Sequence, residues 1–173
     1  MQEASDLLES VESATSTDGE LLLAMADMWL AQNKAVKAVQ AYRRIVELRP
    51  NDVVALNNLA NLLAELPGQS EEALGYIERA ISISGRQPLL LDTKGVILLL
   101  ANRPAEAVPI LEIAASGSQD PRLVFHLYIA LKRSGRDQEA SRLRDRIDPD
   151  QLRKTLLTPD DQRELEIYVN ESN

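Results

Sequence analysis

Cysteine is absent from the 173 residues of this chain, and histidine occurs only once. These absences exclude a disulfide, a thiolate metal site, a cysteine nucleophile and a metal site built from several histidines of one chain. Aromatic residues are also scarce, at 3%, although 45% of the residues are hydrophobic. The apolar residues are therefore mainly Leu, Ala, Ile and Val, a mixture that favours helices over β-sandwiches.

Long hydrophobic segments and an excess of positive charge are missing as well. Apolar runs such as residues 96–101 are far shorter than the roughly 18–20 residues of a membrane span, and the acidic start of the chain is unlike a signal peptide. The net charge of −8 argues against general nucleic-acid binding. We therefore expect a helical protein that needs no cofactor, inserts into no membrane and binds no nucleic acid, with the cytoplasm slightly favoured as its location.

What the sequence does contain is a spacing that recurs four times. The copies begin at Leu22, Leu56, Leu91 and Val124, which lie 34, 35 and 33 residues apart. Steps of three and four place the repeated residues on one face of a helix. The first half of the first copy reads Leu22-x-x-Met25-Ala26-x-x-Trp29, and its second half reads Ala38-x-x-x-Tyr42-x-x-Ile45. The next two copies have Ala60 and Gly95 where the first has the small residue Ala26. The second halves of the three later copies start at Ala73, Ala107 and Ala140.

This pattern resembles the tetratricopeptide repeat family. It departs from the family at Lys94, where a Leu is usual, at Tyr128, where a small residue is usual, and at Arg144, where an aromatic is usual. The resemblance implies an all-α fold, a right-handed superhelix or α-solenoid of helix-turn-helix repeats, in a fragment of a bacterial-type protein. The repeats are predicted within residues 19–148, at about 19–52, 53–87, 88–120 and 121–148.

The two ends break the period. Residues 1–18 fit the second half of a repeat, with an N-terminal capping helix as the alternative, and the first interpretation makes the chain a piece of a longer protein. Residues 149–173 are predicted as C-terminal capping helices, because Asp148-Pro149 and Thr158-Pro159 are typical helix starts. We expect Leu165, Ile167 and Tyr168 to cover the fourth repeat. Inside the third repeat, Pro109 predicts distorted backbone.

No pattern in the sequence predicts catalysis, a metal site or a cofactor. No nucleophile motif accompanies His126, so we expect its side chain to be packed or solvated and not catalytic. Residues 122–154 hold nine Lys or Arg and five acids, which we interpret as a solvated helix face. A phosphate-binding patch, or stacking of the acidic end of one chain on the basic end of another, are the alternatives.

The family resemblance implies a ligand surface on the concave side, lined by the first helix of each repeat. A stripe of apolar, amide and carboxylate groups should lie there, suited to an extended peptide or a partner helix. Phe125 is the expected anchor, and Asn57 and Asn61 would bond to the ligand backbone. The predicted site residues are Leu23, Asp27, Leu30, Asn57, Asn61, Asp92, Val96, Arg122, Phe125 and Ile129. Asn61 and Arg122 match only part of the family's carboxylate clamp, so chaperone-tail binding is not predicted.

Non-catalytic binding of a protein or peptide is therefore the expected function. The alternatives are a substrate-recruiting arm of a larger enzyme, such as a kinase or glycosyltransferase with its catalytic part upstream, and a self-associating scaffold. For the scaffold, weak homo-oligomers would form through apolar side chains of Leu7, Leu8 and Val11 at the N-terminal end.

Overall fold

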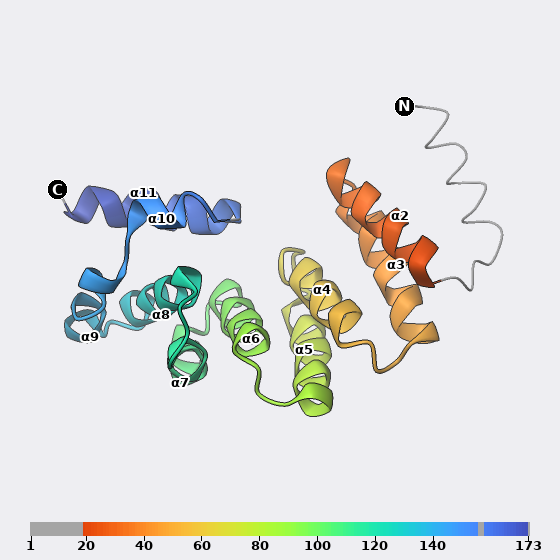
Figure 1. Cartoon of the computed structure of the whole chain (residues 1–173), viewed down its shortest axis with the longest axis horizontal. Helices are drawn as coiled ribbons and strands as arrows, with labels where there is room; N and C mark the ends of the chain where they lie inside the picture. The colour runs from red at the N-terminus through yellow and green to blue at the C-terminus, as the bar shows by residue number, and fades with distance from the viewer. Residues whose placement is uncertain (1–18, 156–157, 173) are drawn as a thin grey trace. The chain divides into compact units, whose positions relative to one another are not determined.

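The structure is a computed structural model that describes residues 19–155 and 158–172 (Figure 1). All regular structure in these ranges is helical, which confirms the all-α prediction. The helices are α2 (Gly19–Ala31), α3 (Ala35–Leu48), α4 (Val53–Ala64), α5 (Ser70–Ser84), α6 (Pro88–Leu100), α7 (Pro104–Ala115), α8 (Pro121–Arg133), α9 (Asp137–Ser141), η1 (Arg144–Arg146), α10 (Pro149–Leu152) and α11 (Pro159–Ser172). The half-repeat or cap predicted at residues 1–18 lies outside the described residues.

The chain divides into two compact units, residues 1–85 and residues 86–173. In the first unit the described helices form two hairpins, α2 with α3 and α4 with α5. In the second unit α6 pairs with α7 and α8 pairs with α9, followed by α10 and α11. None of the described helices is long and apolar enough to cross a membrane.

The turn inside each hairpin depends on one residue in the left-handed conformation. In three hairpins this residue is Asn33, Asn102 or Gly135, with φ of 56°, 57° and 76°. The N–H of the next residue then bonds to the carbonyl five positions back, as from Lys34 to Trp29 at 2.8 Å, which closes the helix C-terminus. The second hairpin, whose turn is longer and spans residues 65–69, uses Gly68 instead.

Small residues stand where two helices of a hairpin cross, as the repeat predicts. Ala26 and Ala60 are fully buried. Gly95 is buried too, and a Cβ atom added to it would lie 2.4 Å from the side chain of Leu111 in α7. The Ala residues that begin each second half are equally buried: Ala38, Ala73, Ala107 and Ala140. The small residues of the repeated spacing are therefore buried, as the pattern predicts.

Pro109 lies within α7, which continues from Pro104 to Ala115, and its side chain is exposed. One local prediction differs from the structure. The second helix of the fourth repeat was expected to reach Ile147, but α9 ends at Ser141 and a short 3₁₀-helix follows. In that stretch Arg144 replaces the aromatic side chain that would pack into a hairpin core, and it is part of the 3₁₀-helix.

The helix starts predicted at the C-terminal end are confirmed. The side chain of Asp148 accepts hydrogen bonds from the backbone N–H groups of Asp150 and Gln151, which caps α10. Thr158 and Asp161 bond reciprocally, each side chain to the backbone N–H of the other, at 3.2 and 3.0 Å. This exchange caps α11 and fixes the position of the Asp161 carboxylate.

Candidate functional site

The first helix of each hairpin presents one face to the core and another to the outside. In the first unit, Leu22, Met25 and Trp29 of α2 are buried, and the residues that follow them form the predicted stripe. We define the first-unit stripe as Leu23, Asp27, Leu30, Asn57 and Asn61. Leu23 is 39% exposed, Asp27 and Asn61 are exposed, and Leu30 and Asn57 are half-buried. These five residues therefore remain accessible.

A hydrogen-bond network joins the helices that carry the first-unit stripe. The Asn58 amide of α4 donates to the Tyr42 hydroxyl at 3.1 Å, and this hydroxyl donates to the Asp27 carboxylate at 3.4 Å. Burial raises the pKa of Tyr42, and the charge of Asp27 raises it further, while the bond from Asn58 lowers it. The hydroxyl stays neutral and holds the α2 carboxylate beside the α4 amides.

Asn57 carries an unused hydrogen-bonding group at this surface. Its Oδ1 atom is enclosed and has no partner among the described residues. A buried acceptor without a partner costs about 1–3 kcal/mol, but this oxygen is not accessible to a ligand in the present conformation of the side chain. Apolar contact at Leu23, the exposed amide of Asn61 and the carboxylate of Asp27 can together bind a peptide backbone and a neutral or basic side chain.

In the second unit the corresponding surface is covered. Nine consecutive residues of α8, from 123 to 131, are buried. Helices α6, α7, α9 and α10 contact α8, and α11 packs on it through Tyr168 on the side away from α7 (Figure 1). Phe125 has 0% exposure and Ile129 has 4%. The expectation that Phe125 anchors an external ligand is therefore wrong for this arrangement, and Ile129 is also inaccessible.

Three aromatic rings fill the space between α8 and α11. Phe125 stacks against Tyr128 with ring centroids 6.5 Å apart, and Tyr168 meets them edge-on at 6.3 and 5.1 Å. Tyr168 and Leu165 are buried as predicted, but Ile167 is 48% exposed and points away from α8. The cap therefore uses the face of α11 opposite to Ile167.

His126 joins three helices of the second unit. Its Nδ1 atom lies 2.8 Å from Oδ1 of Asp92 in α6, and its Nε2 atom lies 3.2 Å from Oδ1 of Asp161 in α11. This second contact has ion-pair distance without hydrogen-bond alignment. Burial alone would lower the pKa of His126, but the two carboxylates outweigh it and raise the pKa to about 10. The buried imidazole is therefore positively charged at neutral pH.

The other predicted residues of the second unit have local roles. Asp92 is bound to His126, and Val96 is half-buried on α6. Arg122 pairs with Asp120 at 2.7 Å, at the start of its own helix, so its guanidinium is already engaged.

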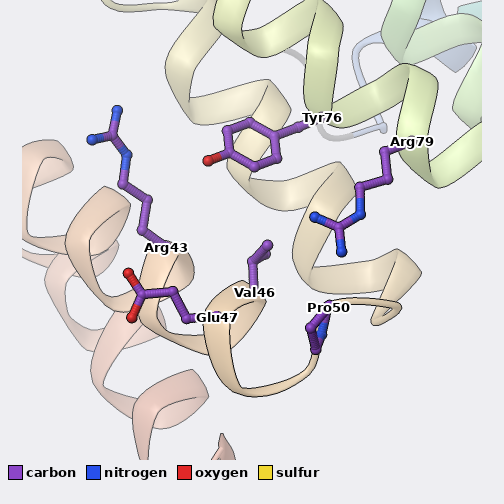
Figure 2. Close-up of a pocket in the computed structure, with 6 residues that line it drawn as sticks. All are labelled: Arg43, Val46, Glu47, Pro50, Tyr76 and Arg79. Carbon is purple, nitrogen blue, oxygen red and sulfur yellow. The ribbon is translucent and has the colours of Figure 1, made fainter.

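A pocket of about 500 Å³ lies on the outer helices of the first unit. Tyr76 and Arg79 extend into it from α5, while Arg43, Val46 and Glu47 of α3 and the nearby Pro50 form the other side (Figure 2). Arg43 also holds Glu72 at 2.8 Å. Two guanidinium groups and a phenol can bind a carboxylate or phosphate, but Glu47 opposes an anion. The pocket was not predicted, because its helices α3 and α5 are second helices and the expected ligand surface lies on first helices.

The fold is shared with known tetratricopeptide repeat proteins. Residues 41–75 match the family model described as a tetratricopeptide repeat. MamA from Desulfovibrio magneticus RS-1 superposes with a TM-score of 0.65 at 18% identity, covering 72% of this chain and 71% of that one. YrrB, described as a TPR protein with an unusual peptide-binding site, gives 0.60 at 20% identity, covering 78% and 70%.

The TPR2B domain of yeast Sti1, in its complex with pHsp70, gives a TM-score of 0.61 at 21% identity, covering 68% of this chain and 99% of that one. No curated protein matches the sequence. At these identities the structural matches establish the fold alone, and the family model matches residues 41–75, about one repeat. The chain therefore shares the fold of tetratricopeptide repeat proteins.

Proposed function

We propose that this protein is a non-catalytic binding module that takes an extended segment of a partner protein on the first-unit stripe. Its fold supports a protein-binding role, since structural relatives include YrrB, whose description names a peptide-binding site, and a Sti1 domain described in a complex with pHsp70. The segment should be neutral or basic, because Asp27 is exposed within the stripe.

The observation that carries this proposal is the difference between the two units. The first-unit stripe is open, with Leu23 39% exposed, whereas Phe125 of the second unit has 0% exposure. A ligand can therefore reach the stripe without displacing any described helix. The exposed amide of Asn61 adds a donor and an acceptor that a ligand backbone can bond to.

The test begins with peptides selected on the full chain from a displayed random library. Their affinities are then measured by fluorescence anisotropy against the wild type and against Asn61→Ala and Asp27→Ala. Each substitution should weaken binding by at least about five-fold, corresponding to about 1 kcal/mol for an important contact. Glu78→Lys, on the outer helix α5, is the matched control and should leave the affinity unchanged.

The outer pocket provides the competing outcome. If Arg79→Ala abolished binding while Asn61→Ala and Asp27→Ala had no effect, the partner would use the pocket between α3 and α5, and the stripe would be the wrong site. Selected peptides rich in Asp or Glu would point to the same conclusion, since they suit guanidinium groups rather than Asp27.

Two broader roles remain as alternatives. A substrate-recruiting arm would use the same stripe but would be joined to a kinase or glycosyltransferase part, which the sequence of the complete gene would reveal. A self-associating scaffold would show a mass above that of one chain in sedimentation equilibrium, and the mass would rise with concentration. A strictly monomeric chain at high concentration contradicts the scaffold.

A further inference from the structure

Helix α11 contacts the rest of the second unit through one narrow face. Its buried residues are Asp161, Leu165 and Tyr168, spaced by four and three positions along the helix. Ile167 and Arg163 are exposed on other faces. Only two apolar side chains of the helix are therefore buried, and the remaining contacts are polar.

Charge complementarity dominates those polar contacts. Arg133 of α8 bonds to Asp160 and Glu164 of α11, and the buried His126 faces Asp161 at 3.2 Å. Residues 159–172 contain five acidic residues and one Arg. A cap that only had to cover apolar surface would not need a buried ion cluster, whose desolvation is costly. The cluster instead selects an acidic helix in one orientation.

The site for Tyr168 recognises both parts of its side chain. The ring packs edge-on against Tyr128, with the Arg144 guanidinium 5.8 Å from its centroid on another side. The hydroxyl donates to the backbone carbonyl of Arg144 at 3.3 Å. An apolar slot that ends in a hydrogen-bond acceptor favours Tyr over Phe or Leu.

We propose that α11 is a displaceable internal ligand of the α6–α8 surface, and that this surface binds in trans an acidic amphipathic helix of a partner protein. The partner helix would carry a carboxylate, a Leu and a Tyr at positions i, i+4 and i+7, the spacing of Asp161, Leu165 and Tyr168. This interaction concerns residues 86–172 and does not depend on the first-unit stripe. Its failure would leave the proposed function untouched.

The first experiment uses a fluorescent peptide with the sequence of residues 158–172 as the probe. Its binding is measured by anisotropy with the full-length wild type and with full-length Tyr168→Ala, in which α11 is loosened. The variant should bind the peptide at least ten-fold more tightly, because the internal helix competes less. Ile167→Ala, on the exposed face, should bind as the wild type does. Adding Arg133→Glu to Tyr168→Ala should abolish binding.

A second experiment needs no variant that loosens α11. Because the chain has no cysteine, a single thiol can report when α11 leaves the surface. Leu165→Cys should react with a thiol reagent faster when excess peptide is added. Ile167→Cys should react fast throughout, and Ala130→Cys, fully buried in α8, should stay protected throughout.

Three results would overturn the proposal. The first is that the peptide binds neither the wild type nor a folded Tyr168→Ala chain and leaves the labelling of Leu165→Cys unchanged. The second is that Leu165→Cys is as protected as Ala130→Cys with peptide present, which would make α11 part of the permanent core. Finally, a dimer formed by exchange of α11, seen as a doubled mass in sedimentation, would assign the surface to a second copy of the chain.

Discussion

His126 and Asp92 are 34 residues apart, one repeat length, and their side chains meet at 2.8 Å. Counted from Leu91 and Val124, Asp92 and His126 stand at adjacent positions of two successive first helices, and they supply the two halves of a buried ion pair. Asp161 of α11 approaches the other nitrogen of the ring at 3.2 Å. A contact made by the repeat geometry therefore becomes the attachment point of the C-terminal helix.

This cluster should make the stability of the protein depend on pH. The pKa of His126 is raised from 6.5 to about 10 in the folded chain. Its contribution is therefore complete below pH 6.5 and is lost as the pH rises from there towards 10. Burial alone would raise the pKa of Asp161, but the hydrogen bond and the charge of His126 outweigh burial and lower this pKa. The contribution of Asp161 to stability is therefore complete above about pH 3.8 and is lost in acid.

Stability to urea, followed by circular dichroism, should consequently be highest between about pH 4 and 6.5 and should fall by pH 9. The other charged groups near the cluster are Arg122 and Asp120, which pair with each other and stay charged over this range. The decline above pH 6.5 should disappear in His126→Gln. An equal decline in that variant would assign it to other groups.

Gly95 should be intolerant of even a methyl group. Gly95→Ala would place a Cβ atom 2.4 Å from Leu111, whose side chain is fully buried. Overpacking of this kind costs about 1–3 kcal/mol, which exceeds the roughly 1 kcal/mol that Ala gains over Gly in a helix. The free energy of unfolding should fall accordingly.

The matched control is Gly75 in α5, which has no atom within 4 Å of an added Cβ. Gly75→Ala should raise the free energy of unfolding by about 0.5–1 kcal/mol. If both substitutions had the same effect, the close approach of α6 and α7 would not be the reason for glycine at position 95.

Phe125→Ala should reduce stability rather than act on a ligand directly. The ring is fully buried between α8 and α11, and removal of a buried Phe side chain costs about 3–5 kcal/mol. Leu23→Ala, at an exposed position, should change stability by less than about 0.5 kcal/mol. Thermal unfolding of the two variants compares them. A small effect at Phe125 would mean that α11 does not cover it in solution.

Asp52 should stabilise the start of α4. Its side chain accepts a hydrogen bond from the backbone N–H of Ala55 at 3.0 Å, so Asp52→Ala should cost about 1 kcal/mol. Gln69, at the same position before α5, makes no such bond, and Gln69→Ala should be nearly neutral. Urea midpoints distinguish the two, and equal losses would show that the cap bond is not the cause.

The sequence alone determined the features that depend on local spacing. Ala26, Ala60 and Gly95 mark the helix crossings, and Asn33 and Asn102, in the turns between paired helices, are of a residue type that tolerates the left-handed conformation. Helical periodicity and turn chemistry act over a few residues, and the repeat multiplies their signal. The accessible first-unit stripe follows from the same periodicity, because it is offset by one residue from the buried positions.

Only the tertiary structure decided where α11 packs, and therefore whether the side chain of Phe125 is exposed or buried. The position of a terminal helix depends on contacts between distant residues, such as His126 with Asp161, which no period encodes. The sequence did indicate that α8 is buried. Apart from His126, residues 123–131 are apolar on every side of this helix, and a helix with apolar residues on every face is buried all round. What covers it could not be determined, because several segments could offer an apolar face and only their packing selects one.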